Sequence, residues 1–237
     1  MLIFCVAGVS HAQKLLPFSP SVQIMLKGGY STPLSGGTYT NGIDNGGTFQ
    51  DYFKAFPGGE LEAVINFTSS FGVYGNVSYD ILTPKGRKGS LPGESFVEER
   101  AHQFSGYVGP RYYFDIPLLP ISIYTDAGIG LYSLKYGDFN VTHITNPPSS
   151  DKYSYSSVSQ LGLSAGAGVN ITTSPLSFIN FSIKYHNLMA KSGVTFVETH
   201  TQTINGVATS TQTSSVYDVD SRGYVQFSLG FGFKLGM

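Results

Sequence analysis

The chain has 237 residues, enough for one large domain or one extended barrel, and only 12% of them are charged. That is about half of the roughly 25% typical of soluble domains, whereas aromatic residues reach 14% and there are 29 glycines. With a formal net charge of −1 and no cluster of Lys and Arg, the chain is not expected to bind nucleic acid.

The first residues resemble a secretory signal peptide. Residues 1–9 are apolar, and Ser10-His11-Ala12 is similar to a small-residue cleavage site. We therefore expect residues 1–12 to be removed and Gln13 to be the mature start. No positively charged region precedes the apolar run, as expected if the sequence begins inside the signal peptide; the alternative is an ordinary buried strand. Without Cys5 the mature chain has no cysteine and forms no disulfide.

Eight segments alternate large apolar residues with small or polar ones, a period of two that predicts β-strands. In chain order they are residues 21–31, 59–66, 71–82, 103–114, 121–134, 159–172, 177–187 and 221–237, and in the last one the alternation begins at Val225. Their lengths are close to the roughly 9 to 11 residues with which a tilted strand crosses a bilayer. No run of about 18 apolar residues predicts a transmembrane helix.

The connections between these segments alternate in length. Short ones cover residues 67–70, 115–120 and 173–176, and long ones cover residues 32–58, 83–102, 135–158 and 188–220. Short periplasmic turns alternating with long extracellular loops are typical of outer-membrane barrels. We therefore predict that residues 13–237 form an all-β domain, a closed eight-stranded antiparallel up-and-down transmembrane β-barrel. A soluble lipocalin-type barrel is the alternative.

Aromatic residues occur near both ends of the predicted strands. Those beside the short turns are Phe67, Phe71, Phe114 and Phe178, and those towards the long loops are Tyr30, Tyr132, Tyr185 and Tyr224. Two interfacial aromatic girdles are expected of a membrane barrel. The alternative is that these residues reflect strand propensity alone.

The small face of the strands carries charges of both signs in equal number. They are Lys27, Arg111, Lys184 and Lys234 against Glu60, Glu62, Asp80 and Asp126. Isolated buried charges are costly, and eight strands enclose a space that side chains can fill. We therefore expect a closed lumen with a network of paired charges; a narrow charged channel is the alternative.

The last long connection contains a predicted hairpin at residues 194–213. Its turn is Asn205-Gly206, a favoured two-residue type I′ sequence, between runs rich in Thr, Val and Gln. Such a hairpin would project above the membrane, and its unpaired edge could accept a strand of another molecule. A loop without any partner is the alternative.

The residues show no catalytic, metal or cofactor pattern. His186 lies on the inner face of its segment and Leu188 occupies the position where a lipid A deacylase-like motif has serine. No spacing of histidines resembles a zinc site, and the paired glycines of the first long loop lack the lysine of a phosphate-binding loop. We predict a protein that is not an enzyme and needs no cofactor.

The last strand carries the alternation furthest, and its end is similar to the signal that the barrel-assembly machinery reads. Gly232, Leu235 and Met237 are the glycine and the two alternating apolar residues of that signal, with Met237 where phenylalanine is usual. With the loop alternation, these residues resemble the superfamily of small outer-membrane β-barrels, which includes the opacity-like and outer-membrane-protein-X-like barrels.

The resemblance implies a bacterial outer-membrane location and contacts with outer-membrane lipid, lipopolysaccharide and the assembly machinery. We expect a monomeric surface barrel that supports the envelope or binds an extracellular ligand through its loops, as in adhesion. The alternatives are binding or passage of small apolar solutes, and modification of lipid A.

Overall fold

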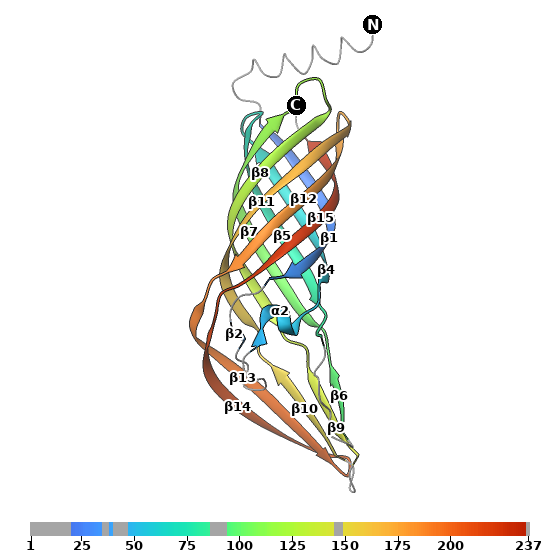
Figure 1. Cartoon of the computed structure of the whole chain (residues 1–237), viewed down its shortest axis with the longest axis vertical. Coiled ribbons are helices and arrows are strands. Elements are labelled where there is room, and N and C mark those ends of the chain that lie inside the picture. Colours follow the sequence, from blue (N-terminus) through green and yellow to red (C-terminus); the bar gives the residue numbers. More distant parts are fainter. Residues whose placement is uncertain (1–19, 35–37, 40–46, 86–93, 145–148, 236–237) are drawn as a thin grey trace.

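Eight antiparallel strands close into a barrel in the computed structural model, which describes residues 20–34, 38–39, 47–85, 94–144 and 149–235. The predicted signal peptide, residues 1–12, lies outside the described residues. The barrel strands are β1 (Ser21–Pro33), β4 (Phe56–Asn66), β5 (Phe71–Leu82), β7 (Ala101–Asp115), β8 (Ile121–Lys135), β11 (Val158–Ser174), β12 (Ser177–Leu188) and β15 (Arg222–Leu235). Figure 1 shows them tilted around one axis.

Hydrogen-bonded pairing runs without interruption around the barrel. Neighbours in sequence pair with each other, and β1 closes the barrel against β15, with Val22 opposite Leu235 and Pro33 opposite Tyr224. Each predicted strand is present, and most extend further towards the long loops than the apolar alternation indicated. The alternation ends earlier because both faces of a strand become polar where it leaves the bilayer.

The outer surface of the barrel is apolar. Leu26, Leu131, Phe104 and Phe227 are each more than half exposed, although they are large hydrophobic residues. A surface of this kind is unfavourable in water and matches the hydrocarbon of a bilayer. The barrel therefore buries its polar side chains and exposes its apolar ones, the reverse of a soluble lipocalin-type barrel.

The interior is filled by tyrosine rings as well as by the expected small and polar residues. The buried tyrosines of the barrel are Tyr74, Tyr107, Tyr113, Tyr124, Tyr132 and Tyr224. Inward glycines make room for them: a β-carbon on Gly168 would collide with the ring of Tyr124, and one on Gly130 would collide with Tyr107. Glycine on the small face thus serves ring packing inside a narrow barrel.

The predicted girdles are correct in part. Phe71, Phe114, Tyr30 and Tyr185 project outwards and are 41–53% exposed. Phe178, Tyr132 and Tyr224 are instead buried in the lumen, so their assignment to girdles was wrong. Their place in the chain is near a membrane interface, but the parity of the strand directs their side chains inwards.

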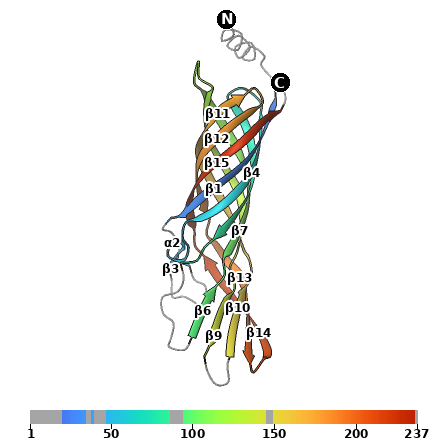
Figure 2. The same ribbon diagram turned by 90° about the vertical axis from the view of Figure 1, so that its right-hand side faces the viewer.

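A second sheet projects from the long-loop end of the barrel, opposite the short turns (Figures 1 and 2). Its strands are β6 (Glu94–Glu98), β9 (Phe139–His143), β10 (Ser149–Tyr155), β13 (Lys191–Ile204) and β14 (Val207–Val219). Their order across the sheet is β14-β13-β10-β9-β6, so β14 and β6 are its edges. This sheet lengthens the molecule along the barrel axis.

The sequence pattern predicted no strands at β6, β9 and β10, which lie in long connections, and the structure shows that strands form there. β6 and β9 have five residues each and β10 has seven, too few for a period of two to stand out from loop sequence. The first long loop contains β2 (Thr38–Tyr39), β3 (Gly47–Thr48) and the single turn α2 (Phe49–Tyr52). The described residues contain no helix with the length and hydrophobicity needed to span a membrane.

Candidate functional site

A single carboxylate, Glu62 on β4, lies at the centre of the lumen and pairs with three cations. Lys27 Nζ is 2.8 Å and Lys184 Nζ is 3.0 Å from its Oε2. Arg111 Nη1 is 2.7 Å from its Oε1, an ion pair whose angles fall outside those of a hydrogen bond. These side chains come from β1, β12 and β7, so the pairs join walls that are not all neighbours in the sheet.

Asp126 is the second anion of this cluster. Arg111 donates from Nε and Nη2 to Asp126 Oδ2, at 3.2 and 2.6 Å, and Lys184 Nζ lies 3.7 Å from the same oxygen. The guanidinium also stacks on Tyr124, with 3.9 Å between Cζ and the ring centroid. A desolvated cation over an aromatic face gains further stabilisation, which helps to offset its burial.

The third anion, Glu60, accepts hydrogen bonds from neutral groups. Asn76 Nδ2 donates to it at 2.6 Å and Tyr107 donates from its hydroxyl at 3.1 Å, while Ser228 donates to the other oxygen. Three buried carboxylates therefore face three buried cations in one connected network. Equal charge of both signs is the condition under which burial of ions in a low dielectric is tolerated.

Two residues of the predicted network, Asp80 and Lys234, lie apart from this cluster. Asp80 is buried near the long-loop end, four residues beyond Asn76, which is opposite Glu62. Lys234 lies four residues beyond Gly230, which is opposite Lys27, and its amine is 5.7 Å from the ring of Phe178. Asp80 is also two residues beyond Ser78, which is opposite Glu60, so the cluster member about 7 Å along the strand from it is another anion. Lys234 lies about 13 Å along the strand from Lys27, and among the described residues neither side chain forms an ion pair with the cluster.

A layer of aromatic and imidazole rings covers the cluster on the long-loop side. His186 contacts the hydroxyl of Tyr132 at 2.9 Å through Nδ1 and Gln226 Oε1 at 3.1 Å through Nε2. Its ring stacks on Tyr224 at 4.5 Å, and Gln103 donates to the hydroxyl of Tyr224 at 3.1 Å. The alternation of the strands indicated an inward His186 but not this ring layer, because rings from strands distant in sequence meet there.

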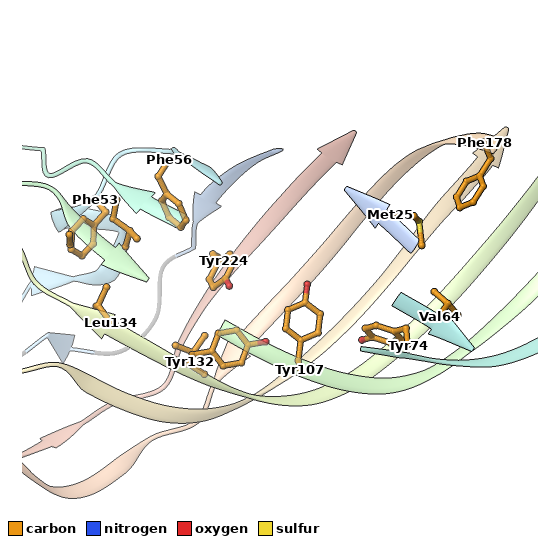
Figure 3. Packing of buried hydrophobic residues seen from close by; sticks show 13 residues of the cluster. Met25, Phe53, Phe56, Val64, Tyr74, Tyr107, Tyr132, Leu134, Phe178 and Tyr224 are labelled. Carbon is orange, nitrogen blue, oxygen red and sulfur yellow. The ribbon is translucent and has the colours of Figure 1, made fainter. Parts of the chain in front are cut away.

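Figure 3 shows that buried side chains continue along the lumen from Phe53 and Phe56 at one end to Met25 and Phe178 at the other. Between them lie the tyrosines and the charged cluster. Eight strands enclose a space that side chains can fill, and here they fill it along its length. Among the described residues, the lumen is therefore a packed core of buried side chains.

The projecting sheet has its own aromatic cluster where it leaves the barrel. Tyr155 stacks on Phe196 at 5.2 Å, and Tyr136 and Tyr217 meet the same phenylalanine edge-on. Val194 packs in the same cluster. Cross-strand aromatic contacts of this kind stabilise a sheet, so the sheet is anchored to the barrel mouth by packing.

Further from the membrane, titratable side chains form a row across four strands. His143 on β9 lies between Glu94 on β6, at 3.2 Å through Nδ1, and Asp151 on β10, at 2.7 Å through Nε2. His200 on β13 reaches the other oxygen of Asp151 at 2.8 Å, and its ring stacks on Tyr153. The row joins four strands side by side.

The electrostatics of this row favour a protonated His143. The hydrogen bond to Asp151 is the main cause that raises the pKa of His143 above 6.5. Partial burial raises the pKa of Asp151, but hydrogen bonds from His200 and His143 outweigh burial and leave it below its usual value. Both ring nitrogens of His143 face carboxylate oxygens, and only the imidazolium can donate from both.

The hairpin predicted at residues 194–213 corresponds to β13 and β14, which extend beyond those limits at both ends. Asn205 and Gly206 form its two-residue turn, with positive φ values of 54° and 78°. Positive φ at both central residues defines the type I′ geometry, which asparagine and glycine adopt at low cost.

The residues of the predicted insertion signal lie in β15 and beyond it. Gly232 faces the lumen, where a β-carbon would collide with the ring of Phe178, and Leu235 faces outwards and is 51% exposed. Met237 is outside the described residues. Gly232 therefore has a packing role in the finished barrel.

The described residues contain no group of three or more His, Cys, Asp or Glu arranged to hold a metal ion. His186 is fully buried, and the row at His143 is a linear chain of pairs. Neither arrangement forms an open site with a nucleophile, a base and an oxyanion donor together.

No protein-family model matches this chain, and no curated protein matches it. Solved structures do match. A major outer membrane protein from Thermus thermophilus is 13% identical with a TM-score of 0.54, over 90% of this chain and 99% of that chain. OprG from Pseudomonas aeruginosa is 12% identical with a TM-score of 0.48, over 91% and 96%. Ail, the attachment invasion locus protein of Yersinia pestis, is 16% identical with a TM-score of 0.41, over 90% and 98%.

At these identities the likeness is one of fold. The closed barrel of eight strands is the fold of the small outer-membrane barrels. Its apolar outer belt matches the bilayer that such barrels span, so the chain is a protein of the bacterial outer membrane.

Proposed function

We propose that this chain is a binding protein of the cell surface, in which a sealed barrel anchors the projecting sheet. The observation that carries the proposal is the edge of β14, which no other described strand pairs with and where Val207–Ser214 are exposed throughout a regular strand. An edge strand offers a row of unpaired N–H and C=O groups that can bind an extended segment of another molecule.

The packed lumen supports a role for the sheet over a role in transport. Lys27, Arg111 and Lys184 are held by carboxylates inside the barrel, and rings of Tyr132 and Tyr224 close the long-loop side. A lateral path for apolar solutes would need a gap between strands, but all eight neighbouring pairs are hydrogen-bonded. Among the described residues, the projecting sheet is therefore the better candidate for a functional surface.

A shortened hairpin tests this proposal. Val197 pairs with Ser214, so removal of residues 197–214 and closure with an Asn-Gly turn between Phe196 and Ser215 keeps the aromatic cluster intact. A control with the same length as the full chain replaces residues 197–214 with a Gly/Ser loop. Both variants and the full chain would be displayed on a non-clumping laboratory bacterium.

Attachment would be measured to plates coated with serum protein, with mucin, with cells that lack the chain, or with cells that display the full chain. We expect the full chain to attach to at least one surface and both variants to lose that attachment. Heat-modifiable gel migration would show that the barrels are folded. Equal attachment by all three proteins, or no attachment by the full chain, would refute a binding role for the sheet.

A further inference from the structure

The two edges of the projecting sheet differ in a way that bears on their partners. β6 has five residues and carries Glu94 and Glu98, and short charged edges resist pairing. β14 has thirteen residues, and its only charged residue is Asp218, near the end. Between Val207 and Tyr217 it has neither proline nor a bulge, because its register with β13 is continuous there. β14 is therefore the edge that lacks the features that prevent pairing with another strand.

The sequence of this edge reads nearly the same in both directions. Residues 208–216 are Ala-Thr-Ser-Thr-Gln-Thr-Ser-Ser-Val, centred on Gln212. Thr211 mirrors Thr213 and Ser210 mirrors Ser214. Thr209 corresponds to Ser215, and at the ends Ala208 corresponds to Val216. An antiparallel pair of two such strands places residues of the same kind opposite each other.

The backbone presents its free groups at the right positions. A two-residue hairpin closes on a hydrogen-bonded pair, here Ile204 and Val207, and the pairs then alternate along the ladder. The residues of β14 whose N–H and C=O groups point away from β13 are therefore Ala208, Ser210, Gln212, Ser214 and Val216. They are symmetric about Gln212, so each would meet an outward-pointing residue of a second copy.

The side chains of these residues lie on the polar face of the sheet. Ser210 contacts Thr201 at 2.8 Å, and Gln212 donates to Thr199 at 3.3 Å. A second β14 would extend a surface of Thr, Ser and Gln, without burying a charge. Ser opposite Ser and Gln opposite Gln can form side-chain hydrogen bonds across the pair.

We propose that β14 binds β14 of a second copy of this chain, antiparallel, with a two-fold axis through Gln212. This deepens the proposed function, on which it rests, by naming the partner. A symmetric parallel pair is excluded, because equivalent N–H groups would face each other at the same height.

The pairing has a consequence for the membranes. β13 and β14 run lengthwise from the barrel to the distal tip (Figures 1 and 2). A two-fold axis that crosses β14 at right angles turns the second barrel to the opposite end of the joined sheet. The two barrels therefore lie in two facing membranes, and the contact joins one cell to another. Each contact is small, and many copies on both surfaces add their effects.

Charged substitutions at Gln212 test the proposed two-fold axis. Full-length wild type, Gln212→Lys and Gln212→Glu would be reconstituted separately in phosphatidylcholine vesicles carrying one of two fluorophores. Gln212 meets only itself across the axis, so each variant faces its own charge. Thr142→Lys on β9 is the matched control, because it adds the same charge to an exposed position three strands from β14.

We expect wild-type and Thr142→Lys vesicles to cluster. Each Gln212 variant alone should cluster about tenfold more slowly, and a mixture of Lys and Glu vesicles should recover the wild-type rate. Failure of wild type to cluster, full clustering by either variant alone, or no recovery in the mixture would overturn the proposal. If self-clustering fails while the full chain still attaches to serum protein or mucin, the proposed binding function stands with another partner.

Discussion

At the scale of single residues, Glu62 determines how the interior is held together. It faces Lys27, Arg111 and Lys184 at 2.7–3.0 Å, with no exposed surface. Glu60 lies in the same cluster but accepts its hydrogen bonds from the neutral groups of Asn76, Tyr107 and Ser228. Glu60 and Glu62 are successive inward-facing residues of β4, yet Glu62 pairs with cations and Glu60 with neutral donors.

Substitution separates these roles. Glu62→Gln removes the one carboxylate that Lys27, Arg111 and Lys184 all contact, and we expect it to lower the free energy of unfolding by about 3–5 kcal/mol. Glu60→Gln keeps a hydrogen-bond acceptor for its neutral donors and should lower it by less. The measurement is urea unfolding of detergent-refolded protein, followed by intrinsic tyrosine fluorescence. Equal losses would contradict the central position of Glu62.

Glycines in the barrel wall make a second residue-scale prediction. A β-carbon on Gly168 would collide with the ring of Tyr124, whereas one on Gly75 meets nothing within 4 Å. We expect Gly168→Ala to destabilise the barrel by about 1–3 kcal/mol and Gly75→Ala to have little effect. Unfolding midpoints in urea distinguish the two, and similar midpoints would show that the lumen has room to adjust.

At the scale of elements, a row of ion pairs links the edge strand β6 to the rest of the sheet. The row consists of Glu94, His143, Asp151 and His200. His143 faces a carboxylate on each side, and its pKa lies above 6.5 because of the hydrogen bond to Asp151. A raised pKa in the folded sheet means that the stabilising contribution is complete below about 6.5 and is lost as pH rises through the folded value.

We therefore expect the amides of β6 to exchange faster as pH rises from about 6 to 8, beyond the intrinsic increase of the exchange rate. Hydrogen exchange detected by mass spectrometry on peptides covering β6 and β9 measures this. In His143→Asn the extra pH dependence should be absent. An unchanged profile in that variant would mean that another group fastens the strand.

At the scale of the whole molecule, the barrel supplies anchorage and the sheet supplies accessible surface. In the part of the chain that the structure describes, buried side chains fill the lumen from Phe53 to Phe178. We expect refolded protein in planar bilayers to show no stable open conductance, and Tyr132→Ala combined with Tyr224→Ala to increase brief leak events. Steady conductance by the wild type would contradict a sealed lumen.

The alternation of residues along the chain was sufficient to predict eight barrel strands, their order and the inward direction of the charged side chains. It succeeds because a strand between lipid and a narrow interior has two chemically different faces over its whole length. The turn at Asn205-Gly206 was predicted for an equally local reason, since few sequences accept positive φ at two successive residues.

Tertiary structure decided which of those inward side chains meet. Asp80 and Lys234 share a face with the cluster, but register places Asp80 about 7 Å along the strand from the anion Glu60 and Lys234 about 13 Å from Lys27. The stacking of His186 on Tyr224 and the joining of β6, β9, β10, β13 and β14 into one sheet bring together residues far apart in the chain. Strand parity is local and can be predicted from the sequence, whereas register and long-range pairing depend on how the whole barrel closes.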